Sequence, residues 1–309
     1  MKNFIKQNWK KLGLFMLVIF TFVYIWNQGG FMSVKGKAIM SYVPKEGEEG
    51  IYSITPTILG GSRNLYLATP EYEDTDYFEA CDGNILFSGK KKNSGYFVLL
   101  EYKDEKLEEL MMSLKPIKWS VWSKKNQELL CVILEDKEKR LGYLYRYNIK
   151  EKTLKKVIDE MVPANQKPLV MQSGEILFVT EKRKPLEIIN TVHILHNNKQ
   201  IEDLIEHGKN LWWYEKGKTF FYVARAGGSI CEYDIETKQS RVVCKDAYAV
   251  GDLTLSLDKK HIVFIKESLT WISTEIYTLC ALDIKDGKVK KVYNLKNMWD
   301  FSSNFAWIQ

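Results

Sequence analysis

GNILFSG (83–89) is the first of six similar apolar segments that recur along this chain. The others are ELLCVIL (128–134), GEILFVT (174–180), KTFFYVA (218–224), HIVFIKE (261–267) and NFAWIQ (304–309). When Phe87, Cys131, Phe178, Phe221, Phe264 and Trp307 are taken as equivalent, the spacings are 44, 47, 43, 43 and 43 residues. A regular period of this length indicates a repeat architecture.

A second element repeats behind these segments. It alternates apolar and polar residues on both sides of a polar turn, as in LYRYNIKEKTLKKV (144–157), ICEYDIETKQSRVV (230–243) and LCALDIKDGKVKKV (279–292). Such alternation around a turn is typical of an antiparallel hairpin. Four short strands in a unit of about 43 residues describe one blade of a β-propeller, because WD40-type blades have a similar length.

The two ends of the repeat region predict how the ring closes. The C-terminus supplies two strands, NMWDF (297–301) and NFAWIQ (304–309), whereas residues 51–69 contain only a hairpin. Two strands from each end would complete one shared blade, which closes the ring and removes open sheet edges. We therefore expect an all-β fold, a six-bladed β-propeller closed by N- and C-terminal strands sharing one blade, over residues 51–309.

The blades resemble the WD40-like (PD40) repeats of the TolB-like six-bladed propellers. The best matches are CDGNILF (81–87), SLDKKHIVF (256–264) and CEYDIETKQ (231–239), and the resemblance covers about residues 45–309. The Ser-Pro-Asp-Gly turn of that family is degraded here and lacks its proline. Members of the family range from periplasmic protein-binding modules to domains that gate peptidases. The resemblance thus implies a six-bladed propeller of bacterial origin, but it does not choose a function.

The N-terminal segment predicts a membrane anchor. LGLFMLVIFTFVYIW (12–26) is almost unbroken in its apolar character, and the uncharged stretch extends to residue 34, which reaches the roughly 20 residues that cross a bilayer. Lysines are denser before this run than just after it, so the N-terminus is expected in the cytoplasm and the remainder outside. The expected organisation is a basic cytoplasmic tail (1–11), one transmembrane helix acting as a signal anchor (12–34), a linker (35–50) and the propeller (51–309).

A cleaved signal peptide is the alternative for this segment, because a basic start and a hydrophobic core are also its marks. The run is long and bulky, however, and no Ala-x-Ala-like site follows it. We therefore favour an uncleaved anchor.

The charge distribution argues against nucleic acid as a partner. The formal charge is +6, but without the four lysines of residues 1–34 the chain has 41 basic and 39 acidic residues, a net of +2. A nucleic-acid-binding domain normally carries a basic stripe. The expected partners are the membrane, through the N-terminal helix, and a protein, a peptide or a cell-envelope polymer.

No motif assigns chemistry to the chain. A Gly-x-Ser-x-Gly elbow, a phosphate loop and a His-Glu-x-x-His helix are all missing from the sequence, so no catalytic residue, metal site or cofactor is expected. His193 and His196 would point to opposite faces of a strand, which disfavours a shared metal. The acidic run EYEDTD (71–76) could bind a cation weakly. We expect a binding or scaffold module, with a hydrolase-type or other enzyme, whose site would lie at the channel mouth, as the alternative.

Three tryptophans are candidates for ligand binding. Trp213 and Trp299 recur at one repeat position, which favours packing between blades, whereas Trp119, Trp212 and Trp271 lie outside that register. Exposed on one face of the propeller, these three could stack sugar rings or clamp a peptide.

Two cysteines are candidates for a disulfide. Cys231 and Cys244 flank one hairpin symmetrically about Thr237–Lys238, so they could face each other across adjacent strands. A location outside the cytoplasm would permit oxidation. Two unpaired buried thiols are the alternative.

Overall fold

The computed structural model describes residues 34–308, apart from 43–49, 58–59, 82, 124–127, 186, 225–227, 270–274 and 296–303, and also residues 16, 17 and 20. The predicted anchor (12–34) therefore lies almost wholly outside the described residues, and so does the predicted strand 297–301. In the described part of the chain, no helix is long and apolar enough to cross a membrane.

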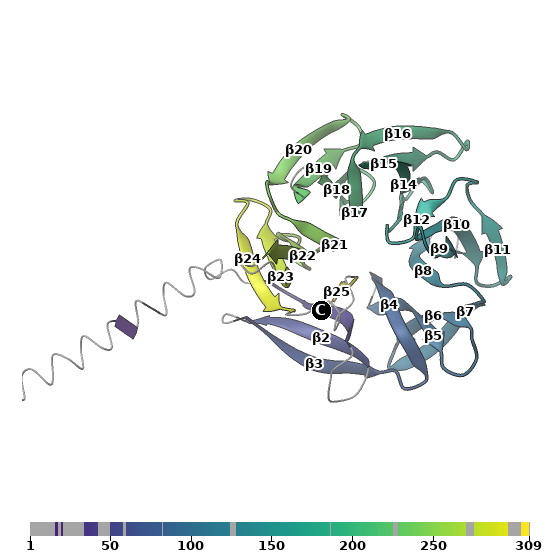
Figure 1. The fold of residues 1–309 in the computed structure, drawn as a ribbon, viewed down its shortest axis with the longest axis horizontal. Coiled ribbons are helices and arrows are strands. Elements are labelled where there is room, and N and C mark those ends of the chain that lie inside the picture. Colours follow the sequence, from purple (N-terminus) through teal and green to yellow (C-terminus); the bar gives the residue numbers. More distant parts are fainter. Residues whose placement is uncertain are drawn as a thin grey trace, which may run out of the picture.

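The described strands form six antiparallel sheets around a central axis (Figure 1). Blade 1 contains β4 (Tyr72–Cys81), β5 (Asn84–Lys91), β6 (Phe97–Lys103) and β7 (Lys106–Ser113). Blade 2 contains β8 (Ile117–Ser123), β9 (Glu128–Asp136), β10 (Leu141–Asn148) and β11 (Thr153–Lys156), and β12 (Val162–Pro163) pairs with β10. Blade 3 contains β13 (Leu169–Val170), β14 (Ile176–Lys184), β15 (Glu187–Leu195) and β16 (Ile201–Glu206).

The remaining three sheets complete the ring. Blade 4 contains β17 (Gly208–Glu215), β18 (Thr219–Ala224), β19 (Ile230–Asp234) and β20 (Gln239–Cys244). Blade 5 contains β21 (Ala249–Leu255), β22 (His261–Leu269), β23 (Glu275–Asp283) and β24 (Val289–Asn294). Blade 6 contains β25 (Ala306–Ile308), β1 (Lys37–Tyr42), β2 (Gly50–Thr57) and β3 (Gly60–Ala68) in that order. The first strands β4, β8, β13, β17, β21 and β25 contact one another in turn and form the inner wall of the ring.

Blade 6 confirms that the two chain ends share one sheet, but it divides the strands differently from the prediction. Three strands come from the N-terminal side and β25 alone is described from the C-terminal side, where we expected two from each. The additional strand, β1, lies in the segment that we expected to be a linker (35–50). Its sequence KAIMSY is short and only weakly apolar, so the alternation that marks a strand is hard to see.

Two of the six residues taken as equivalent, Trp307 and Phe221, do not occupy the position that the other four share. Trp307 lies on the innermost strand of its blade, whereas Phe264 lies on the second strand. In blade 4, Phe221 faces blade 5, and its neighbour Phe220 faces blade 3 as Phe178 faces blade 2. A shift of one residue reverses the face of a strand, and the spacing of apolar residues cannot reveal it when both neighbours are phenylalanine.

The hydrophobic core is divided into six clusters, each between two neighbouring blades. Successive residues of a second strand serve different clusters. Phe178 packs against blade 2 and the preceding Leu177 packs against blade 4, because side chains alternate across a sheet. Each blade is therefore buried on both faces, which explains why the second strands are continuous apolar runs.

Trp307 fixes the joint between the two chain ends. Its side chain is 5% exposed, and its indole N–H donates to the Lys35 carbonyl oxygen at 2.8 Å. Gly36 adopts φ +109° beside it, and a Cβ there would lie 2.2 Å from Trp307 Nε1. A glycine is thus required for the close approach of β1 to β25.

We expect Trp307→Ala to destabilise the fold by about 3–5 kcal/mol, because it leaves a cavity in a buried cluster and removes the bond that joins the ends. Urea unfolding of the full chain measures this change. Leu114→Ala, at a side chain 75% exposed, should shift the free energy of unfolding by less than about 0.5 kcal/mol. A loss for Trp307→Ala as small as that of the control would contradict the assigned role.

An ionic cluster joins blades 3 and 4 at their outer side. His196 Nδ1 lies 2.6 Å from Glu175 Oε1, and His196 Nε2 lies 3.2 Å from Glu202 Oε2. Glu202 also accepts a hydrogen bond from Lys238 of blade 4. The hydrogen bond to Glu175, followed by that to Glu202, raises the pKa of His196.

Because the folded pKa of His196 is raised, its contribution to stability is complete below about pH 6.5 and disappears as the pH rises through the folded pKa. His196→Ala should therefore cost more stability at pH 6 than at pH 9, by less than about 1 kcal/mol because the pairs are partly exposed. Unfolding by urea at the two pH values tests this, with Lys199→Ala in the following turn as the control. A cost independent of pH would rule out the ionic role.

Candidate functional site: the central channel

The inner strands share a distortion that shapes one mouth of the channel. In β4, β8, β17 and β21 the pairing register with the next strand shifts and leaves two successive residues without a regular partner. These pairs are Tyr77–Phe78, Lys118–Trp119, Asn210–Leu211 and Gly251–Asp252. The first residue of each pair lines a cavity at the mouth, and the second is buried in the wall. A bulge re-aims a side chain in this way.

The cavity, which we call the funnel, has a volume of about 1740 Å³. It opens at the end of the ring where the inner strands β4, β8, β17 and β21 begin. Its charged side chains are the five acids Asp74, Asp76, Glu181, Glu187 and Glu267 and the five bases Lys118, Lys137, Arg140, Lys184 and Lys209. Its amide side chains are Asn165, Gln166, Asn190, Asn210 and Asn304. The lining is therefore balanced in charge and rich in groups that both donate and accept hydrogen bonds.

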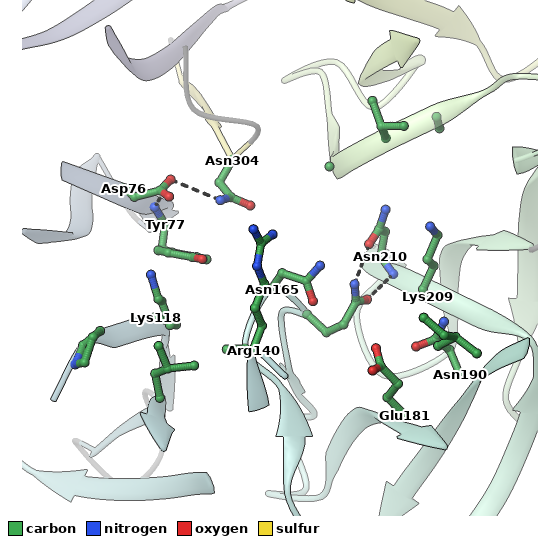
Figure 2. Close-up of a pocket in the computed structure, with 18 of the residues that line it drawn as sticks. Asp76, Tyr77, Lys118, Arg140, Asn165, Glu181, Asn190, Lys209, Asn210 and Asn304 are labelled. Carbon is green, nitrogen blue, oxygen red and sulfur yellow. Dashed lines mark hydrogen bonds between the residues drawn. The ribbon is translucent and has the colours of Figure 1, made fainter. Parts of the chain in front are cut away.

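Two hydrogen-bonded pairs hold parts of the funnel in place (Figure 2). Asn304 Nδ2 donates to Asp76 Oδ1 at 3.1 Å, which ties the segment before β25 to β4. On the other side, Gln166 Nε2 donates to Asn210 Oδ1 at 2.9 Å, and the Asn210 backbone N–H donates to Gln166 Oε1 at 2.7 Å. These reciprocal bonds join two buried residues, so their positions are set by the fold.

A cationic region lies between these two pairs. Figure 2 shows Arg140 extending into the funnel between Tyr77 on one side and Asn210 on the other. Lys118 Nζ lies 4.6 Å from the centre of the Tyr77 ring, in cation–π contact. Burial lowers the pKa of Lys118, and the charge of Arg140 adds to this while Asp76 and Asp74 oppose it.

Tyr77 has a strained backbone at this place. Its φ is +59°, a conformation that costs a bulky residue about 1–3 kcal/mol. Its N–H donates to Asp76 Oδ1 at 2.8 Å, and its ring packs edge-on against Trp119 at 5.5 Å. Strain of this kind tends to be retained at functional sites, which marks this side of the funnel as a candidate for ligand contact.

Below the funnel, buried charged side chains fill a part of the channel that we call the waist. Lys167 is 4% exposed and its ammonium binds the Glu79 carboxylate. The same ammonium lies 3.6 Å from the ring centre of Trp212 and 5.5 Å from that of Trp119. A buried lysine is stable only when its charge is paired, and here one carboxylate and two indoles surround it.

Asp252 is the exception among the second residues of the four bulges. Phe78, Trp119 and Leu211 fill their places with apolar or aromatic side chains, but blade 5 has a carboxyl group that is 4% exposed. Its Oδ2 has no hydrogen-bond partner in the described part of the chain. Burial raises the pKa of Asp252 well above its usual range, and the attraction of Lys167 only partly opposes this.

The structure separates the three candidate tryptophans. Trp119 is fully buried in the cluster between blades 2 and 3, so its ring is not available on a surface. Trp212 is half-buried and lines a second, smaller pocket. Trp271 lies outside the described residues. Of the three, only Trp212 is seen beside a cavity.

The two candidate cysteines are free thiols in this structure. A bulge between Ile230 and Cys231 places Cys244 opposite Ile230 and Cys231 opposite Val242. Cys231 packs in the cluster toward blade 3 and Cys244 packs toward blade 5. The expected symmetry of the hairpin is thus lost, and although the disulfide stays a prediction, this arrangement disfavours it.

A chain of polar contacts in blade 3 has the order of a catalytic triad. His193 Nε2 lies 2.7 Å from Thr180 Oγ1, and His193 Nδ1 lies 2.8 Å from Asp203 Oδ1. None of these three residues lines either of the two pockets described here, and Thr180 and His193 are buried within the sheet. The contacts satisfy a buried histidine that stacks on Phe178, which is a structural role.

No group of three or more His, Cys, Asp or Glu side chains is placed to hold a metal ion among the residues that the structure describes. Asp74 and Asp76, from the acidic run 71–76, instead line the funnel together with cations. Sequence patterns do not mark Lys118, Arg140, Lys167 or Asp252, because none of them belongs to a recurring motif. Lys118 and Arg140 are in blade 2, Lys167 precedes β13 of blade 3, and Asp252 is in β21 of blade 5. An alignment of the inner strands could have found Asp252, because Phe78, Trp119 and Leu211 occupy the corresponding position in three other blades.

The fold defines the class of protein as a six-bladed β-propeller. The fold is similar to the crystal structure of TolB from Acinetobacter baumannii, with a TM-score of 0.65 and 10% sequence identity over 88% of this chain and 66% of that chain. It is also similar to a chain in the crystal structure of a nidogen/laminin complex, with a TM-score of 0.61 and 8% identity over 89% of this chain and 99% of that one. No family model matches the sequence, and no curated protein matches it. At these identities the similarity establishes the fold.

We expect Asp252→Asn to stabilise the protein by about 1–3 kcal/mol at neutral pH, because it removes a carboxyl group that is costly to ionise in the buried wall. The folded pKa is raised, so the penalty is absent below the unfolded value of about 3.9 and grows as the pH rises. Urea unfolding between pH 4 and pH 8 should show a gain that increases with pH.

Asp258→Asn provides a control of opposite sign. Burial raises the pKa of Asp258, but hydrogen bonds from the Ser256 hydroxyl and the Lys260 N–H outweigh it, so the net pKa is lowered. The cost of this variant should be complete above about pH 4 and should disappear as the pH falls below it through the lowered pKa of Asp258, so its unfolding is measured down to about pH 3. If both variants responded to pH in the same direction, the assignment of Asp252 as a buried acid with a raised pKa would be wrong.

Proposed function

We propose that this protein is a membrane-anchored binding module whose funnel receives a segment of a partner polypeptide outside the cytoplasmic membrane. The observation that carries the proposal is the lining of the funnel, in which five amide side chains lie among five acids and five bases. A cavity of about 1740 Å³ is large enough for several residues of an extended chain.

The chemistry of the lining matches a polypeptide better than other polymers. Amide side chains can donate to a backbone carbonyl and accept from a backbone N–H, as a peptide requires. Lys118 and Arg140 offer partners for acidic groups, and Asp74 and Glu267 offer partners for basic groups. A polyanion would meet as many acids as bases there, which disfavours nucleic acid and acidic cell-envelope polymers.

The closed ring suits such recognition because it fixes the side chains before the partner arrives. The Gln166–Asn210 and Asp76–Asn304 pairs connect different blades and immobilise opposite sides of the funnel. A site whose groups are already ordered loses less conformational entropy on binding. The solved structure of nidogen with laminin shows a chain of similar fold inside a protein complex, which supports the proposal.

The anchor and the location form part of the same proposal. The uncharged run 12–34 after a lysine-rich start supports a single N-terminal helix with the propeller outside. A tether to the membrane raises the effective concentration of the funnel near other envelope proteins. Weak contacts spread over a wide cavity would then suffice for capture.

Site-specific photo-cross-linking on intact membranes tests the function. A photoreactive residue replacing Asn190, which lines the funnel, should give a discrete cross-linked polypeptide, whereas one replacing Val242, exposed on the outer strand of blade 4, should not. Arg140→Glu should reduce the yield at position 190 several-fold, since it reverses the central cation. Mass spectrometry of the product identifies the partner.

Equal capture at positions 190 and 242 would contradict a role of the funnel. If the species cross-linked at position 190 were a carbohydrate without polypeptide, the proposed polypeptide partner would be wrong and a cell-envelope polymer would be favoured.

A further inference from the structure

The channel has a second pocket at its other mouth. This pocket has a volume of about 250 Å³ and lies where β4, β8 and β17 end, whereas the funnel lies where they begin. Its ten lining residues include Glu79, Trp122, Lys167, Trp212, Trp213 and Lys216. We call it the indole pocket, because three of its ten residues are tryptophans from two blades.

The three indoles are held by packing on one side and remain half-buried. Trp213 meets Phe220 edge-on at 6.3 Å, and Trp122 packs against the cluster between blades 1 and 2. One face of Trp212 is occupied by the Lys167 ammonium at 3.6 Å. Rings fixed in this way present flat surfaces to a ligand with little loss of side-chain entropy.

The charge of the indole pocket is positive. The Lys167 ammonium is already paired with Glu79, so these two groups cancel. Lys216 lies in the turn after β17 and makes no ion pair with any residue that the structure describes. One uncompensated cation thus stands at the rim of an aromatic pocket.

The indole pocket is separate from the funnel. Lys167, Glu79 and Trp119 fill the waist, and neither Lys167 nor Glu79 lines the funnel. A ligand at this mouth would therefore not compete directly with a segment held in the funnel, and the inference does not depend on the proposed function.

We infer that the indole pocket is a binding site for a small ligand consisting of one ring with an acidic substituent. The volume sets the size, because benzene alone fills an apolar cavity of roughly 150 Å³ and the indole pocket has space for one ring with a short side group. The indoles stack on the ring, and Lys216 binds the acidic group. An aromatic acid and a sugar acid share this chemistry.

Calorimetric titration of the full chain in detergent tests the inference with four probes. Benzoate and glucuronate represent the two sources of the ligand, and benzamide and glucose are their uncharged counterparts. At least one acid should bind saturably at one site, about tenfold or more tighter than its uncharged counterpart. Binding of benzoate alone would identify an aromatic acid, and binding of glucuronate alone would identify a sugar acid.

Lys216→Glu should weaken the binding of that acid by about tenfold, because it reverses the charge at the rim. Lys218→Glu is the matched control, since it lies in the same turn but does not line the indole pocket. Arg140→Glu in the funnel should leave the affinity unchanged. Both lysines are exposed in the turn, so the folding of these two variants is expected to be preserved.

The inference is overturned if neither acid binds the folded protein, or if Lys216→Glu and Lys218→Glu have the same affinity as the unchanged chain. It is also overturned if Arg140→Glu abolishes binding, because the probe would then occupy the funnel.

Discussion

The pairing of β25 with β1 is the constraint on which the rest of this structure depends. Six sheets can surround a channel only if the first and last blades meet, and here the last strand of the chain completes a sheet begun by residues 37–68. Each blade is buried between two neighbours, so an open ring would expose apolar faces of both terminal blades. The bond from Trp307 to Lys35 and the close approach at Gly36 show how tightly this joint is packed.

Closure also determines what the channel can hold. The inner strands approach the axis together, so a side chain on any of them meets side chains from several blades. Lys167 and Glu79 are 88 residues apart in sequence and yet form a buried pair at the waist. Breaking such a pair by removing one partner leaves an unpaired buried charge and is costly, although the net stability of an intact pair is small. The waist is therefore better understood as a partition between two cavities than as a source of stability.

The repeated bulge shows how one blade design produces a site with little symmetry. The same local distortion occurs in β4, β8, β17 and β21, but it carries Tyr77, Lys118, Asn210 and Gly251 into the funnel. The backbone repeats and the side chains do not. A propeller thus keeps its blade geometry while each blade contributes a different chemical group, which is why fold similarity alone does not identify a ligand.

The sequence by itself determined the repeat, the strand type and the blade number. Apolar runs such as GEILFVT and HIVFIKE, spaced at about 43 residues, leave few other ways to bury their side chains, because a strand that is apolar on both faces needs a sheet neighbour on each side. The sharing of a blade between the chain ends followed from counting strands. It did not reveal β1, whose six residues alternate too weakly, nor the one-residue difference between Phe220 and Phe221.

Only the tertiary structure decided which residues form the sites. It buried Trp119, placed Trp212 beside Trp122 and Trp213, and separated Cys231 from Cys244 by a bulge. Lys118, Arg140 and Asp76 come from two blades and give no local pattern, because inner strands β8 and β4 and the turn between β9 and β10 bring them together only in the closed ring. Periodicity records what each strand buries, whereas a site in the channel depends on which single residues the closed ring brings together.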